Sequence, residues 1–210
     1  MIFSRGVTFS PLNSIAGIDE AGRGPLIGPL VICLASTNNP NKLIEIGVKD
    51  SKKISAKKRM YLYNQLLEFC SFYFIKIDAV DLDKEMEKIS LNEIEARAMA
   101  ELMSIVKIKT IIDLPDRYPK TFSERMKKYP DLEYLADHKA DDKYPIVSAA
   151  SIAAKVNRDN FIEEIKNECK IDFGSGYPSD PKTKKAFLEN YKLIEPFIRK
   201  KWKIKIRKQF

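Results

Sequence analysis

The chain has 210 residues, of which 44% are hydrophobic and 31% are charged, with a formal net charge of +8. This length fits one mid-sized domain, and the cationic surplus favours a polyanionic partner such as nucleic acid, although a solvated lysine-rich surface gives the same total. The single histidine, His138, excludes a zinc site that needs two imidazoles. Three scattered cysteines indicate a reducing cytoplasm, and no apolar run is long enough to span a membrane.

The first half of the chain predicts strands followed by a helix and a further strand. Residues 1–14 lack the apolar core of a signal peptide, and we expect them to form an extension outside the fold. Two short apolar runs flank a Gly- and Pro-rich segment, which predicts neighbouring strands joined by a tight loop. The elements predicted here are strands at 14–18 and 30–36, a helix at 55–70 with Ser55 as its N-cap, and a strand at 71–77.

The second half alternates helices and strands and ends in helices. Ser90 followed by Glu93 is a capping box that marks the start of an amphipathic helix. The order of elements favours a mixed α/β sheet with a small helical C-terminal part. The elements predicted here are helices at 90–106, 147–156, 158–169 and 184–193, strands at 109–114 and 132–136, a turn-rich loop at 174–181 and a basic tail.

Carboxylates stand at the ends of the predicted strands. Asp19 and Glu20 end the first strand, Asp113 ends an isoleucine-rich strand, and Asp141 and Asp142 precede the small-residue helix. Adjacent strand residues point to opposite faces, so Asp19 and Glu20 reach one metal pair only if the strand bends near the following glycines. Each acid taken alone has an ordinary interpretation as a surface pair, a turn residue or a helix-capping charge.

Taken together, these acids supply hard oxygen ligands and no soft ones. Such sites hold Mg²⁺ or Mn²⁺. Two such ions, about 3.5–4 Å apart, can activate a water molecule and stabilise the leaving oxygen in phosphodiester cleavage. This chemistry needs neither a histidine base nor a covalent nucleophile, which suits a chain with one histidine.

Other residues are candidates for contact with a nucleic acid. Gly22, Arg23 and Gly24 offer close backbone approach and one cation, and Tyr177 is an aromatic residue on a Gly/Pro loop. A plain turn and a packed loop anchor are the alternatives. Several cations could contact phosphates, although each alone is as readily a solvated charge: Lys52, Lys53, Lys139, Lys155, Arg158 and the tail 199–208.

The run IAGIDEAGRGP at residues 15–25 resembles the signature of ribonuclease HII in its archaeal style. Five further stretches agree with that family in order and approximate spacing, so the resemblance covers about residues 15–202. These stretches are DSKK at 50–53, LNE at 91–93, HKADD at 138–142, SAASI with AKV between 148 and 156, and GSGYPSDP at 174–181.

The resemblance implies a ribonuclease-H-like mixed β-sheet flanked by helices, with a small helical C-terminal segment. The catalytic domain would span 15–165, and a helical, basic segment at 166–210 would complete the substrate groove. The implied catalytic and metal-binding acids are Asp19, Glu20, Asp113 and Asp141, with Asp142 as the alternative to Asp141 and two Mg²⁺ or Mn²⁺ ions as cofactor. The implied substrate-binding residues are Gly22, Arg23, Gly24, Tyr177, Lys52, Lys139, Ser148 and Ser151.

The implied activity is endonucleolytic cleavage of the RNA strand of RNA/DNA hybrids and nicking of DNA duplexes at embedded ribonucleotides, leaving 3′-hydroxyl and 5′-phosphate ends. The Gly22–Gly24 loop would read the 2′-hydroxyl, and Tyr177 would pack against the neighbouring sugar. We expect a cytoplasmic monomer that serves DNA replication and repair. The alternatives are a non-catalytic nucleic-acid-binding module, which clustered carboxylates disfavour, and another nuclease of the same fold.

Overall fold

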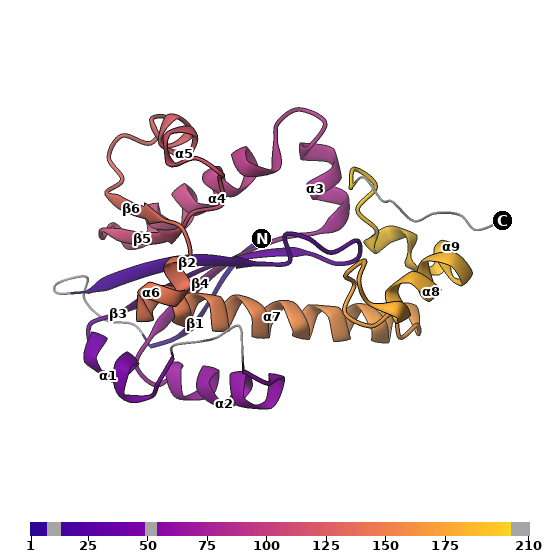
Figure 1. The fold of residues 1–210 in the computed structure, drawn as a ribbon, viewed down its shortest axis with the longest axis horizontal. Helices are drawn as coiled ribbons and strands as arrows, with labels where there is room; N and C mark the ends of the chain where they lie inside the picture. The colour runs from indigo at the N-terminus through magenta and orange to yellow at the C-terminus, as the bar shows by residue number, and fades with distance from the viewer. Residues whose placement is uncertain (8–13, 49–53, 203–210) are drawn as a thin grey trace.

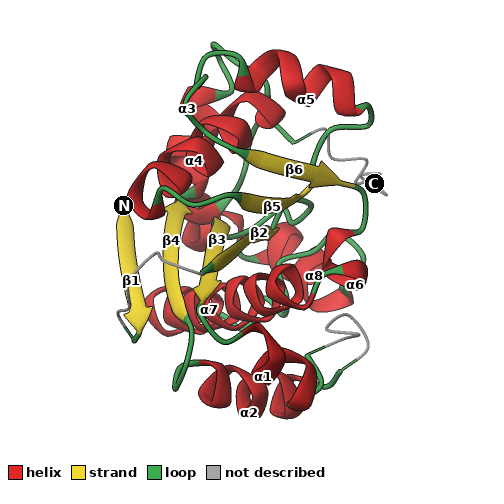
Figure 2. Cartoon of the chain, turned by 90° about the vertical axis from the view of Figure 1, so that its left-hand side faces the viewer, coloured by secondary structure: helices red, strands yellow, loops and turns green. Residues whose placement is uncertain are grey.

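The computed structural model describes residues 1–7, 14–48 and 54–202, and in these ranges six strands form one mixed sheet. The strand order is β1-β4-β3-β2-β5-β6 (Figure 2). The strands are β1 (Ile2–Gly6), β2 (Ile15–Ala21), β3 (Leu30–Thr37), β4 (Ser71–Ile77), β5 (Thr110–Asp113) and β6 (Tyr134–Asp137).

The sheet has an antiparallel half and a parallel half. β1, β4, β3 and β2 pair antiparallel in that order, whereas β2, β5 and β6 pair parallel. The carboxyl ends of β2, β5 and β6 therefore meet at one edge of the sheet, which is where open α/β sheets place their functional sites.

Helices cover both faces of the sheet (Figure 1). β3 is buried along its whole length, and its alternate residues divide between two cores because successive strand side chains point to opposite faces. One core packs against α1 (Pro40–Glu45), α2 (Ala56–Leu66) and α7 (Pro145–Cys169), and the other packs against α3 (Ala79–Glu85), α4 (Leu91–Val106) and α5 (Pro119–Met126).

A third, smaller core ties the C-terminal helices to the far end of α7. It joins Leu26 and Ile27 of the loop after β2 to Ile162 of α7 and to residues of the C-terminal part. Ile27 also forms an isolated bridge with Ile198. The C-terminal elements are α8 (Pro181–Glu189), α9 (Tyr191–Ile194) and the 3₁₀ turn Glu195–Phe197.

The prediction of a mixed sheet flanked by helices is confirmed, but the placement of the N-terminal extension is wrong for residues 2–6. They form β1, which pairs with β4, and Phe3 stacks on Phe74 with ring centroids 4.7 Å apart. This edge strand is mostly exposed, so it carries no apolar alternation that a sequence pattern could detect. Residues 8–13 lie outside the described ranges.

Helix boundaries also differ from the prediction. The two helices expected at 147–156 and 158–169 are one helix, α7, because Asn157 and Arg158 at the junction are polar but buried. The helix expected at 184–193 is two helices, separated at Asn190. Four short helices had no predicted counterpart: α1, α3, α5 and α6 (Ala140–Lys143).

No helix within the described ranges is both long enough and apolar enough to cross a membrane.

Candidate active site

Three acids meet at the carboxyl ends of the parallel strands. Asp19 lies near the end of β2, Asp113 is the last residue of β5, and Asp141 lies in α6, just after β6. One carboxylate oxygen from each lies within 4.8 Å of the others. Asp113 Oδ1 accepts a 2.8 Å hydrogen bond from the backbone N–H of Ala140, which holds α6 beside β5. The fold thus brings together residues that are far apart in sequence.

Glu20 lies beside this cluster but leaves β2 on the opposite face from Asp19. The β2–β3 ladder continues through Ala21, and the chain turns at Gly22. The chain thus bends at the first of the glycines that follow the acidic pair. Both side chains line the same pocket.

The acids raise one another's affinity for protons. Burial, followed by the charges of Glu20 and Asp113, raises the pKa of Asp19 well above its ordinary value. Burial and then the charge of Glu95 raise the pKa of Glu20 to about 8. Glu20 Oε2 is buried and has no hydrogen-bond partner among the residues that the structure describes. A set of crowded hard oxygens with an unsatisfied acceptor fits a divalent cation such as Mg²⁺.

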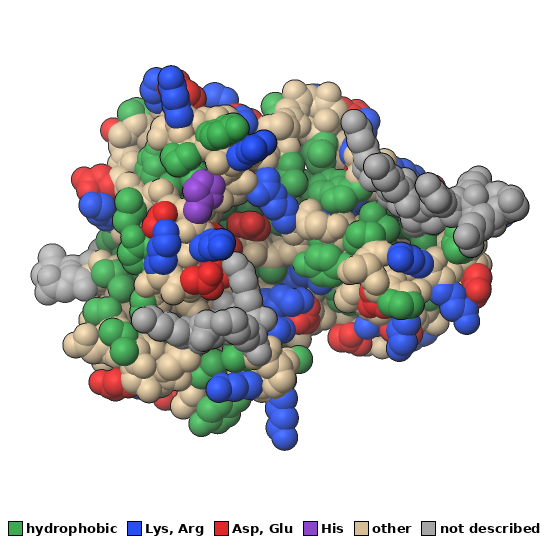
Figure 3. Space-filling view, viewed as in Figure 1, with side chains coloured by type: hydrophobic (Ala, Val, Ile, Leu, Met, Phe, Trp, Pro, Cys, Tyr) green, Lys and Arg blue, Asp and Glu red, His purple; other side chains and the backbone are tan. Residues whose placement is uncertain are grey.

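The pocket around these acids has a volume of about 350 Å³. Acidic and basic side chains gather in the hollow between the part that carries α5 and β6 and the C-terminal helices (Figure 3). The lining residues are Asp19, Glu20, Ala21, Gly22, Arg23, Gly24, Arg59, Asp113, Ser151, Ile152, Lys155 and Tyr177.

The Arg23 side chain lines the pocket but is held by other parts of the chain. Its Nη1 donates to the Pro115 carbonyl at 2.5 Å, and its Nη2 donates to Asn92 Oδ1 at 2.6 Å. Its Nε lies 3.3 Å from the fully buried carboxylate of Glu95. Arg23 therefore anchors the glycine turn to α4, and no sequence pattern predicted that its charge would be paired inside the protein.

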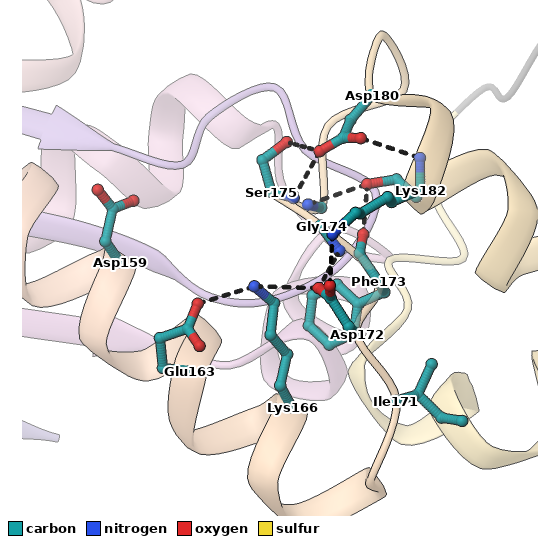
Figure 4. A network of polar contacts seen from close by, with 12 residues as sticks. Asp159, Glu163, Lys166, Ile171, Asp172, Phe173, Gly174, Ser175, Asp180 and Lys182 are labelled. Atoms are coloured by element: carbon teal, nitrogen blue, oxygen red, sulfur yellow. Dashed lines mark hydrogen bonds and ion pairs between the residues drawn. The ribbon is translucent and has the colours of Figure 1, made fainter. Parts of the chain in front are cut away.

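The loop that carries Tyr177 is braced by its own polar side chains (Figure 4). Asp180 Oδ2 accepts hydrogen bonds from the backbone N–H of Ser175 at 2.7 Å and from its hydroxyl at 2.8 Å. Asp172 forms ion pairs with Lys166 of α7 at 3.4 Å and with Lys182 at 2.6 Å. These contacts hold the loop without using the side chain of Tyr177, which lines the pocket.

Two cations stand on the pocket wall opposite the glycine turn. Arg59 of α2 and Lys155 of α7 both form ion pairs with Asp159, and Arg59 does so at 3.1 Å. Lys155 was a sequence candidate, whereas Arg59 was missed. The sequence signal available for this cluster was the spacing of Lys155 and Asp159, because residues four apart on a helix lie side by side and can form an ion pair.

The remaining substrate-binding candidates from the sequence do not all lie at the pocket. Ser151 lines the pocket. Ser148 is fully buried and its hydroxyl donates to the Val48 carbonyl, so the fold uses it to hold the chain after α1. Lys139 is exposed beside α6 and does not line the pocket. Lys52, with Lys53, lies outside the described residues.

Two arginines that were phosphate candidates are buried in the protein. Arg158 and Arg199 are both fully buried, and both donate hydrogen bonds to backbone carbonyls. Because both side chains are buried, the prediction that they contact phosphates directly is wrong. Their charges instead bind backbone carbonyls inside the protein.

A mixed sheet with helices on both faces and clustered acids at its strand ends defines the ribonuclease-H-like class of metal-dependent nucleases. The family model described as Ribonuclease HII matches residues 16–205. The chain belongs to the ribonuclease HII family, whose members are endonucleases that cleave the RNA of RNA/DNA hybrids. The resemblance seen in the sequence is therefore confirmed, and the chain is a ribonuclease H.

Relatives and solved structures agree. The chain is 46% identical over 202 residues to the ribonuclease HII of Methanococcus maripaludis strain C7, covering 90% of this chain and 84% of the relative. Its fold is similar to that in a PCNA:RNase HII complex from Archaeoglobus fulgidus, with a TM-score of 0.84, 40% identity, and coverage of 90% and 95%. It is also similar to ribonuclease H2 from Pyrococcus horikoshii, with a TM-score of 0.80, 41% identity, and coverage of 90% and 94%.

Proposed function

We propose that Asp19, Glu20, Asp113 and Asp141 are the catalytic acids and that they hold two divalent ions, Mg²⁺ or Mn²⁺. Asp19, Asp113 and Asp141 would face one ion together, and Glu20 would complete the site from the other side of β2. The single observation that carries the proposal is the convergence of three carboxylate oxygens, one each from Asp19, Asp113 and Asp141, within 4.8 Å of one another. Asp19 and Asp113 also line the pocket. When bound, the two ions would activate a water molecule and stabilise the leaving oxygen.

The walls of the pocket suit recognition of a single ribonucleotide. Gly22, Arg23 and Gly24 present backbone groups next to the acids, and a Cβ at Gly24 would lie 3.7 Å from Tyr177 Cε1. The turn and the ring are therefore close enough to contact two adjacent sugars of one strand. In this proposal the turn binds the 2′-hydroxyl and Tyr177 packs against the neighbouring sugar.

Cations on the rim would bind the strand on either side of that sugar. The cations Arg59 and Lys155 and the hydroxyl-bearing Ser151 line the pocket wall. Lys139 would contact a phosphate outside the pocket. Lys52 is proposed as a phosphate contact from the sequence alone. Electrostatic contacts of this kind position the sugar–phosphate backbone of the nucleic acid without reading its bases. We further propose that the protein acts as a cytoplasmic monomer in replication and repair, a setting that suits its three free cysteines.

The test is cleavage of three matched substrates: a DNA duplex with one ribonucleotide, its all-deoxy analogue, and a long RNA/DNA hybrid. Each is incubated with Mg²⁺, Mn²⁺ or a chelator. We expect nicking of the first and cleavage of the third with either metal, and no product from the all-deoxy duplex or with the chelator. Equal cutting of the all-deoxy duplex would refute recognition of the 2′-hydroxyl. Binding without turnover in either metal would refute the metal site.

A further inference from the structure

Arg158 is a buried cation between the two loops that form the pocket walls. Its side chain projects from the middle of α7 and is 1% exposed. Nη2 donates to the Ser175 carbonyl at 3.0 Å and to the Ile27 carbonyl at 3.5 Å. One guanidinium thus joins the Tyr177 loop to the segment that follows the glycine turn, although more than a hundred residues separate them in sequence.

Both loops are shaped around this side chain. Gly22 has φ +89°, and a Cβ there would lie 2.9 Å from Arg158 Nε and 2.5 Å from the Pro29 carbonyl oxygen. Gly176 has φ +80°, and a Cβ there would lie 2.5 Å from the Ile27 carbonyl oxygen and 3.3 Å from Arg158 Nη2. Only glycine combines this backbone conformation with such a close approach. The guanidinium and the neighbouring carbonyls therefore together limit how closely each loop approaches α7.

The Tyr177 ring lies over the same guanidinium. The distance from Arg158 Cζ to the ring centroid is 5.0 Å, within the range of a cation–π contact. The same ring lies beside Gly24, where an added Cβ would be 3.7 Å from Cε1 and 4.0 Å from Cδ1. Because Arg158 contacts both the loop backbone and the ring, it determines the position of the ring relative to the glycine turn.

Stability alone does not account for a charge at this place. The carboxylate paired with Arg158 is that of Asp159, at 3.8 Å and 39% exposed, and Arg158 Nε has no hydrogen-bond partner among the described residues. Burial of a weakly compensated cation is costly, and an apolar side chain of similar length often serves a core better. A specific geometric task explains the arginine.

We propose that Arg158 is a positioning residue for ribose recognition, holding the Tyr177 ring at a set distance from the Gly22–Gly24 turn. The inference rests on the proposed role of Tyr177 and adds the residue through which the ring is placed. Arg158 does not touch the substrate. Its effect passes through Tyr177, so it should vanish when the ring is removed.

The experiment measures kcat/KM on a duplex with one ribonucleotide, together with the thermal midpoint, for Arg158→Met and Arg158→Lys. Met keeps the length and apolar stem, and Lys keeps the charge but loses the planar fork. We expect both variants to lose about tenfold or more in kcat/KM, because a displaced substrate contact costs that much. Activity is measured well below the thermal midpoint of each variant, so that a loss in kcat/KM of the folded protein is separated from any loss of stability.

Lys166→Met is the matched control. Lys166 is also a cation of α7 tied to the same loop, but through the ion pair with Asp172 rather than through Tyr177 (Figure 4). We expect its kcat/KM to stay within about twofold of wild type. An equal loss in Lys166→Met and Arg158→Met would overturn the proposal, because any disturbance of the loop would then suffice.

A double-mutant cycle with Tyr177→Ala gives the decisive outcome. Added to Tyr177→Ala, Arg158→Met should cost no more than about twofold, because the ring through which it acts is gone. The same tenfold cost in both backgrounds would overturn the inference while leaving the role of Tyr177 intact. A Tyr177→Ala variant with wild-type kcat/KM would instead refute the proposed function of the ring, and the inference with it.

Discussion

The fold treats Glu93 of α4 and the acids at the strand ends in opposite ways. Glu93 accepts hydrogen bonds from Lys128 and from Arg125, the latter at 2.8 Å, and these bonds hold its pKa below the ordinary value. At the strand ends, burial and mutual repulsion raise the pKa of Asp19 and Glu20. The difference teaches that the chain supplies its own cations where an acid serves structure. The raised pKa values at the strand ends agree with the proposed binding of divalent ions there.

The largest expected effect concerns activity. Asp19→Asn should reduce cleavage by about 10³-fold or more, because loss of one ligand removes several kcal/mol of transition-state stabilisation. Glu93→Gln, the control from the structural group, should stay within about twofold because Glu93 does not line the pocket. Single-turnover cleavage rates at saturating Mg²⁺ measure both. A comparable loss in the two variants would erase the distinction between the groups.

The next effect is on the pH dependence of metal binding. Glu20 has a pKa of about 8 without metal, so a proton competes with the ion below that pH. The apparent Mg²⁺ affinity should rise by up to about tenfold per pH unit between about pH 6 and 8 and then level off. Calorimetry in buffers of different ionisation enthalpy would detect the released proton. A pH-independent affinity with no proton release would contradict the raised pKa.

The same shift has a signed consequence for stability. Because the folded-state pKa of Glu20 exceeds its ordinary value of 4.5, the metal-free folded state binds the proton more tightly than the unfolded chain does. This contribution is fully present below about pH 4.5 and is lost as the pH rises through about 8. In chelator, the thermal midpoint should therefore decrease as the pH is raised from about 6 to about 8.5. Saturating Mg²⁺ should make that decrease smaller.

The smallest effect is a pair of stability changes of opposite sign. In chelator, Asp19→Asn should raise the free energy of unfolding by about 1 kcal/mol, because it removes a buried charge repelled by its neighbours. Glu93→Gln should lower it by about 0.5 kcal/mol, a value discounted for solvent screening. Urea unfolding measures both. Changes of the same sign would show that the two groups of acids are not electrostatically distinct.

Much of the fold could be predicted because its signals are local. The helical spacing and Ser90 cap placed α4 correctly, and the apolar runs placed β3 and β4 to within a residue. The failures fall where tertiary contacts decide. β1 is stabilised by the backbone of β4, and α7 continues through Asn157 and Arg158 because other elements bury those polar groups.

The residues of the candidate site also fall into those that the sequence predicted and those that only the tertiary structure revealed. Strand-end positions and the family resemblance made Asp19, Asp113 and Asp141 candidates, and the fold brings them together. Arg59 and Glu95 lie in no recognised stretch and reach the site only through packing of α2 and α4. Arg158 was visible as a charge, but whether it faces solvent or two loops depends on contacts made from across the molecule.

The sequence by itself determined the family and the mixed sheet and supplied the candidate acids, because strand patterns, caps and the glycine-rich motif depend on neighbouring residues. The tertiary structure alone decided which charges are exposed and which are internal. Burial and pairing depend on distant segments meeting at the edge of the sheet. Arg23 and Arg158 thereby became anchors of loops, while Asp19, Asp113 and Asp141 were brought within reach of one ion.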